Sequence, residues 1–164
     1  MGSEMCIRDR PSTPLTSSAE VLNHDLMVAS NIVKRSGARF TPIRKRVYDL
    51  LLQSTQPLGA YDILALMNGV GSSKPPTVYR ALDWLMDMGL AKKVTSQSKF
   101  VALRPDKDNQ AIAFLLCQSC GQAEAFDPGP LTENLASIAA QKGFSERETV
   151  IEVMGYCKDH RETS

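Results

Sequence analysis

Histidine and cysteine are scarce in this chain. Among its 164 residues there are only two His, His24 and His160, and four Cys. No apolar run approaches the roughly 18 residues that a membrane-spanning helix needs. No stretch near the N-terminus has the charged-then-apolar pattern of a signal peptide. We therefore expect a cytoplasmic protein with no membrane partner. The length suits one domain or two small ones, which excludes a large multidomain enzyme.

Motifs of several enzyme classes are missing as well. The sequence has no Gly-rich phosphate-binding loop and no H-x-E paired with the P-C-x-x-C of zinc-dependent deaminases. It also has no His near a candidate nucleophile. These absences predict a protein that is not an enzyme and has no small-molecule substrate.

The net charge of +1 hides an uneven distribution of charge. Residues 1–104 carry 14 Lys and Arg against 8 Asp and Glu, a net charge of +6, whereas residues 105–164 carry 5 against 10, a net charge of −5. Residues 34–104 alone carry 12 against 4, a net charge of +8. One interpretation is an ordinary fluctuation of surface charge. The other is a polyanion-binding module joined to a module with a different task.

Apolar periodicity predicts helices and a hairpin in the basic half. We expect a helix over 19–35, capped by Ser18, and a second that opens at Thr41 with Pro42 in its first position. A short helix over 61–67 and a longer one between Lys74 and Gly89 follow. Two alternating runs, 90–94 and 99–103, predict a β-hairpin. The expected buried stripes are Ile43, Val47, Leu50 and Leu51 in the second helix and Val78, Leu82, Leu85 and Met86 in the longer one.

The acidic half is predicted to be a small α+β unit, with strands over 112–116, 124–126 and 148–153 and a helix over 131–142. The chain as a whole is then α+β. We divide it into a disordered leader (1–17), a winged helix-turn-helix domain (18–104), a linker (105–110) and a small α/β domain (111–164). A unit of about 55 residues has little core and usually needs a metal, a disulfide or a partner chain.

A zinc site is the stabilising element that the acidic half offers. Cys117 and Cys120 form a C-x-x-C-G knuckle. Thirty-six residues separate Cys120 from Cys157, which forms a second pair of the same spacing with His160. Two such pairs can close a tetrahedron around structural Zn²⁺. Asp159 or water could replace His160, which lies four residues from the end of the sequence. A disulfide is disfavoured in a reducing cytoplasm. A thioredoxin-like redox pair would need a parallel α/β unit around the C-x-x-C.

The helix that follows Lys74 is the expected recognition helix. In a helix-turn-helix the second helix of the pair lies in the major groove of DNA, where Arg80 can donate two hydrogen bonds to a guanine edge. Thr77 and Tyr79 suit phosphate or thymine-methyl contacts, and Arg44 and Lys74 suit phosphates. Arg80 considered alone would be a solvated surface residue. The net charge of +8 and the order of elements favour contact with DNA.

Five segments together resemble the ferric uptake regulator (Fur) superfamily. They are KPPTVYRALDWLMDMGL at 74–90, RFTPIR at 39–44, AYDI at 60–63, FLLCQSCG at 114–121 and VIEVMGYC at 150–157. The last four look most like its zinc uptake regulator (Zur) branch, and the resemblance runs from about residue 20 to residue 160. It implies a homodimeric, metal-dependent transcriptional repressor in zinc homeostasis. Its N-terminal winged helix would bind a palindromic operator, and its C-terminal α/β module would form the dimer.

The resemblance also implies roles for individual residues. Tyr61 and Arg80 match DNA-reading positions of the family, and Cys117, Cys120 and Cys157 match its structural zinc site. His160 stands where the family usually has a fourth Cys. His is a chemically acceptable zinc ligand there.

The family's second metal site, the regulatory one between its two domains, is where this sequence departs from the pattern. That site is built from His, Cys and acidic residues, but Lys92 stands where a His is expected, and residues 92–116 contain no His or Cys. A protonated Lys cannot bind zinc. The acidic residues Asp106, Asp108 and Glu124 alone would make a poor zinc site. His24 is a possible remaining ligand, although a lone His on a helix is more often a surface residue. A peroxide sensor, which needs His around iron, is disfavoured.

Two hypotheses therefore remain open. The first is a Zur-like repressor with a structural Cys3His zinc and a degraded or relocated sensor site, so that a second, regulatory zinc stays uncertain. The second is a constitutive DNA binder, or a zinc-stabilised interaction module that pairs with an intact relative, in which metal sensing has been lost. The basic helix favours the first hypothesis, and the missing sensor ligands favour the second.

Overall fold

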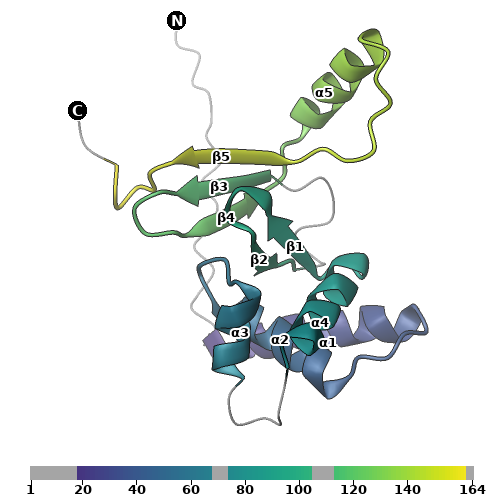
Figure 1. Ribbon diagram of the computed structural model, residues 1–164, viewed down its shortest axis with the longest axis vertical. Coiled ribbons are helices and arrows are strands. Elements are labelled where there is room, and N and C mark those ends of the chain that lie inside the picture. Colours follow the sequence, from purple (N-terminus) through teal and green to yellow (C-terminus); the bar gives the residue numbers. More distant parts are fainter. Residues whose placement is uncertain (1–17, 68–73, 105–112, 162–164) are drawn as a thin grey trace, which may run out of the picture.

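The computed structural model describes residues 18–67, 74–104 and 113–161. Its elements form two groups, the lower and upper parts of Figure 1. The first group holds α1 (Ser18–Arg35), α2 (Pro42–Gln53), α3 (Ala60–Leu66), α4 (Pro75–Asp87), β1 (Ala91–Val94) and β2 (Lys99–Ala102); the second holds β3 (Ala113–Cys117), β4 (Ala123–Phe126), α5 (Pro130–Gln141) and β5 (Ile151–Gly155). The predicted leader 1–17 and linker 105–110 lie outside the described residues, so the division of the chain at those points stays a prediction.

The helix boundaries follow the expected local signals. The Thr41 side chain accepts a hydrogen bond from the Arg44 amide at 3.4 Å, and Pro42 is the first residue of α2. A left-handed glycine, Gly37, follows α1 with φ +73°, as is common at helix C-termini. Ser18 is itself the first residue of α1 rather than the capping residue before it. Helix ends routinely differ by one residue in this way.

The helical group encloses one apolar core, and its composition corrects two of the predicted positions. Ile43 is 36% exposed and Met86 is only half-buried, whereas Tyr48 and Ala81 are buried. Because Tyr48 is part of the buried face of α2, that face is centred farther from Ile43 than we predicted. The burial of Tyr48 is tolerated because its hydroxyl donates a 2.8 Å hydrogen bond to the Leu103 carbonyl, which satisfies the polar end of the side chain.

The β1–β2 hairpin lies between the four helices of the first group and the sheet of the second (Figure 1). Its strands pair antiparallel from Ala91 opposite Ala102 to Val94 opposite Lys99. A single 3-10 turn, Thr95–Gln97, joins them. The residues between the two predicted runs therefore form the tip of the hairpin.

The second group is a three-stranded sheet in the order β4-β3-β5. β3 is antiparallel to β4 and parallel to β5, with Ala113 opposite Ile151 and Cys117 opposite Gly155. A parallel pair needs a long crossover, and the segment that contains α5 provides it. This pairing places the last strand at Ile151–Gly155, three residues later at its start than the predicted 148–153.

An apolar surface runs over the outer face of the sheet and along α5. Leu131, Leu135 and Ile138 of α5 are 45%, 37% and 52% exposed. Leu115 and Val153 are paired on adjacent strands and are also largely exposed. Figure 1 shows α5 extending away from the sheet. A single chain therefore leaves this surface, which we call the outer apolar face, uncovered.

The predicted fold class is confirmed: the chain is α+β, with a winged helix followed by a small α/β unit. In the part of the chain that the structure describes, no helix has the length and apolar character to cross a bilayer.

Candidate metal centre and nucleic-acid interface

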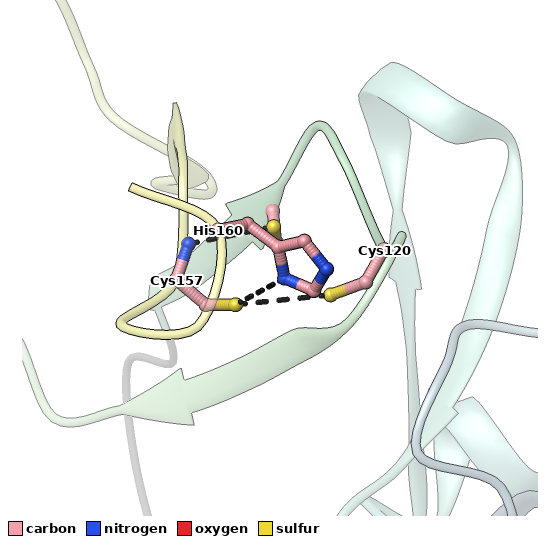
Figure 2. A group of neighbouring side chains, drawn as sticks. Cys120, Cys157 and His160 are labelled. Carbon is pink, nitrogen blue, oxygen red and sulfur yellow. Dashed lines mark hydrogen bonds between the residues drawn. The ribbon is translucent and has the colours of Figure 1, made fainter. Parts of the chain in front are cut away.

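Three cysteines and one histidine from two distant parts of the sequence meet at one end of the sheet. Cys117 is the last residue of β3 and Cys157 follows β5 by two positions. The parallel pairing of these strands brings their ends together. The ligand atoms of Cys117, Cys120, Cys157 and His160 all lie within 4.8 Å of one another. Figure 2 shows the His160 ring and the Cys120 and Cys157 sulfurs turned toward each other.

Two tight turns hold these side chains in place. The Gly121 amide donates to the Cys117 carbonyl at 2.9 Å, and Gly121 has φ +73°, a conformation that glycine adopts without strain. In the second turn the His160 amide donates to the Cys157 carbonyl, also at 2.9 Å. The Cys157 amide in turn donates to the Cys117 sulfur at 3.4 Å and links the two pairs.

The electrostatics of the cluster favour a cation. Hydrogen bonds from the Cys120 and Cys157 amides lower the pKa of Cys117 from 9.0 to about 6, against the opposing effect of burial. The Gln122 amide acts to lower the pKa of Cys120, but the neighbouring Cys117, burial and Cys157 outweigh it, so that this pKa is raised. The Cys117 thiol therefore loses its proton readily at neutral pH, whereas deprotonation of Cys120 beside it is disfavoured. A divalent cation between the sulfurs relieves that repulsion.

The geometry fits a tetrahedral zinc ion. Zn–S bonds of about 2.3 Å at tetrahedral angles place two sulfurs about 3.8 Å apart, and the Cys120 and Cys157 sulfurs lie 3.9 Å apart. His160 Nδ1 lies 3.0 Å from the Cys157 sulfur. The group that these atoms form includes His160 and not Asp159. Three sulfurs and one imidazole nitrogen are a common donor set for structural zinc.

The residues predicted to contact DNA lie in the helical group, most of them exposed. Tyr61 on α3 is 69% exposed, and Tyr79 and Arg80 on α4 are exposed. Lys74 is the exposed N-cap of α4, and Thr77 is half-buried in its first turn.

Arg44 differs from the other predicted DNA contacts because it is already engaged within the protein. Its guanidinium carbon lies 4.1 Å from the centre of the Trp84 ring, a cation–π contact. Its Nη1 donates to the Arg39 carbonyl at 2.8 Å. These contacts fasten the start of α2 to α4.

The structure assembles no second metal cluster among the residues that it describes. Across 18–67, 74–104 and 113–161, Cys117, Cys120, Cys157 and His160 are the one group of three or more His, Cys, Asp or Glu with metal-binding proximity. His24 lies on α1 with Nδ1 3.8 Å from Asp25 Oδ1. Asp106 and Asp108 lie outside the described residues.

Several contacts between the two groups of elements have no signal in the sequence pattern. Glu152 of β5 accepts hydrogen bonds from the Thr95 and Ser96 amides. Gln56, which follows α2, donates a hydrogen bond from Nε2 to the Cys120 carbonyl at 2.6 Å. Such contacts join residues more than 50 positions apart, and no local periodicity predicts them.

A winged helix joined to a small sheet that carries a thiolate-rich cluster defines a class of metal-containing DNA-binding proteins. The model of the ferric uptake regulator family matches residues 35–154. The zinc uptake regulation protein of Escherichia coli (strain K12) is 34% identical over 134 residues, which are 80% of this chain and 78% of that protein. This chain belongs to the ferric uptake regulator family, and the resemblance predicted from its motifs is confirmed.

Solved structures of zinc regulators share the fold. A zinc uptake regulator complexed with zinc and DNA aligns with a TM-score of 0.78 at 32% identity, over 88% of this chain and 95% of that one. The holo form of XcZur aligns with a TM-score of 0.77 at 32% identity, over 84% and 96%. Its apo form gives a TM-score of 0.51 at 33% identity, over 85% and 97%. This chain therefore superposes better on the relative complexed with zinc and DNA and on holo XcZur than on apo XcZur.

Proposed function

We propose that this chain is a DNA-binding transcriptional repressor most like the zinc uptake regulators, which binds palindromic operators as a homodimer in zinc homeostasis. The observation that carries the proposal is the exposed face of α4. Tyr79 and Arg80 point to solvent there, in a fold that aligns with a relative solved on DNA. The proposal places the protein in the cytoplasm and assigns it no catalytic activity.

Within this proposal, Arg80 reads a base edge in the major groove and the other DNA contacts position the helix. Arg is suited to guanine because its guanidinium donates two parallel hydrogen bonds. Thr77 and Tyr79 on the same helix and Lys74 at its N-cap contact the DNA backbone. Tyr61 approaches from α3. Arg44, held against Trp84, supplies positive charge at the start of α2.

Cys117, Cys120, Cys157 and His160 hold one structural zinc in the proposed repressor. The donor set and the sulfur spacing support this assignment. A zinc ion bound there cross-links the ends of β3 and β5, which gives a unit with little core of its own an additional constraint.

The outer apolar face is the proposed dimer interface. Leu115 and Val153 on the sheet and Leu131, Leu135 and Ile138 on α5 are exposed in one chain. A contiguous exposed apolar surface is typical of an interaction site. Two-fold pairing covers such a face on both chains at once, and it would place two α4 helices on one operator.

A second candidate function is favoured by one observation. The described residues assemble only one metal cluster, so a constitutive DNA binder that has lost metal sensing is the alternative. A zinc-stabilised interaction module that pairs with a metal-sensing relative belongs to the same alternative.

One experiment tests the proposal against the alternative. Zinc per chain is measured by elemental analysis, and duplexes are selected from a random DNA pool with and without added zinc. We expect enrichment of a palindrome by protein with one tightly bound zinc per chain. Failure to enrich any sequence in either condition would reject DNA recognition. A second zinc with zinc-dependent enrichment would establish a sensor site.

A further inference from the structure

The tip of the β1–β2 hairpin is held by the sheet of the other half of the chain. Glu152 Oε1 accepts a 2.6 Å hydrogen bond from the Thr95 amide, and Oε2 accepts a 3.1 Å bond from the Ser96 amide. Both amides lie at the start of the Thr95–Gln97 turn, where the first N–H groups have no partner within the turn. One carboxylate therefore satisfies two consecutive amides. Such charge-assisted bonds are roughly twice as strong as neutral ones.

The two halves also meet at other points. An apolar cluster of Val94, Leu103, Phe114 and Leu116 lies between the hairpin and the inner face of the sheet. Lys92 Nζ lies 4.0 Å from Glu148 Oε1, in a pair whose Glu side chain is 69% exposed. An ion pair of that kind contributes little. Glu152 is thus the main polar contact between the hairpin tip and the sheet among the residues described.

The position of the hairpin also determines the position of α4, because the two elements are directly connected. Met88, Gly89 and Leu90 alone separate α4 from β1. The Leu90 amide donates to the Leu85 carbonyl at 2.8 Å, and the Leu103 amide donates to the Leu90 carbonyl at 2.9 Å. The hairpin and α4 are thereby tied together as one body. Fixing the hairpin tip against the sheet fixes the direction in which Arg80 points.

The described residues of this interface do not suit a regulatory metal. Its described residues are apolar at Val94, Leu103 and Phe114, and Lys92 pairs with Glu148. No metal-type cluster includes any residue of the hairpin among those the structure describes. Resting on the DNA binding of the proposed function, and in line with the alternative in which metal sensing is lost, we propose that Glu152 is a positioning residue. It sets the orientation of the recognition helix, a role that a regulatory metal would otherwise have at this interface.

The orientation matters because the proposed repressor is a dimer. Two recognition helices reach successive major grooves only when they lie about one helical turn of DNA, roughly 34–36 Å, apart. In a dimer formed through the outer apolar face, that separation depends on how each helical half sits on its own sheet. A loosened hairpin tip therefore weakens DNA binding without touching DNA.

The test compares Glu152→Ala and Glu152→Gln with Glu133→Ala as the control. Glu133 is an exposed carboxylate of α5, so the control removes the same charge from the same half of the chain. Protein carrying one zinc per chain is titrated with the selected palindrome, with and without excess zinc. We expect Glu152→Ala to bind about tenfold or more weakly, Glu152→Gln to lose less, and the control and excess zinc to change nothing.

A second readout separates this inference from the proposed function. Amide hydrogen exchange at Thr95 and Ser96 should accelerate in Glu152→Ala, while zinc content and dimer formation stay as in the control. If no protein binds any DNA, the proposed function fails, and faster exchange at the two amides still supports the role of Glu152 in holding the hairpin. Exchange that matches the control overturns it. So does a tenfold or greater strengthening of wild-type binding by a second zinc.

Discussion

Arg104 Nε lies 2.8 Å from Oδ2 of Asp25, and this pair joins the end of the hairpin to the first helix. Asp25 is 1% exposed, whereas the Arg104 side chain is 42% exposed. The two partners are therefore not equivalent. Removing the arginine leaves a buried carboxylate without its cation, and removing the aspartate leaves an arginine that water can reach.

This asymmetry predicts unequal effects on stability. Arg104→Met should lower the free energy of unfolding by about 2 kcal/mol, less than the roughly 3–5 kcal/mol seen for fully buried pairs. Asp25→Asn should cost less, and the double variant should cost less than the sum of the two. Urea unfolding of the four proteins measures the coupling. Strict additivity would show that the pair contributes nothing.

Arg80 should govern both the affinity and the sequence preference of DNA binding. Arg80→Ala should cost about 1–3 kcal/mol of specific binding and relax the preference at one base pair in each half-site. Arg147→Ala, an equal loss of charge in the other half, is the control. An operator footprint unchanged by Arg80→Ala would exclude α4 as the reading helix.

The zinc cluster should tolerate exchange of one donor for another but not the loss of a thiolate. Cys117→Ser should lose the tightly bound zinc and weaken the dimer, because this sulfur links both turns. His160→Cys should retain one zinc per chain, since Cys₄ sites are equally suitable. Elemental analysis after dialysis against a chelator distinguishes these variants. One tight zinc retained by Cys117→Ser would contradict the ligand assignment.

The outer apolar face should require apolar character at its centre. Leu135→Asp should raise the dimer dissociation constant a hundredfold or more, about 3 kcal/mol, because it would bury an unpaired charge. Ser137→Asp adds the same charge on a side of α5 that points away from Leu131, Leu135 and Ile138, and serves as the control. Light scattering over a concentration series measures the association. Equal dimerisation of both variants would show that the dimer forms through another surface.

Acid should weaken the contact between the hairpin and the sheet, because it protonates Glu152. Burial acts to raise the pKa of Glu152, but hydrogen bonds from the Ser96 hydroxyl and the Ser96 and Thr95 amides outweigh it, and the pKa lies below its ordinary value of 4.5. A carboxylate with a lowered pKa stabilises the fold fully above pH 4.5 and loses that contribution as the pH falls through the folded-state pKa. The stability difference between wild type and Glu152→Gln should therefore shrink only below that pH. A difference that is constant with pH would rule out the ionised carboxylate as its source.

Local signals predicted most of the elements but not how the two halves meet. Thr41, Pro42 and Gly37 act on their immediate neighbours, so the sequence reveals the helix ends that they set. The spacing of the cysteines likewise predicted the group that the parallel strands assemble. The start of β5 was misplaced because its position depends on pairing with β3, which lies in a distant part of the sequence. Glu152 was missed for the same reason, since nothing near it distinguishes it from an ordinary surface carboxylate.

At Thr95 Glu152 binds the backbone amide, whereas at Ser96 it accepts hydrogen bonds from both the amide and the hydroxyl. An amide hydrogen is present in every amino acid except proline. Position 95 is therefore free to mutate widely, and a substitution by proline is the one that would break the contact there. Selection at this interface should act on residue 152 and on the exclusion of proline from position 95, so that the loop can diverge in sequence while its place in the molecule stays the same.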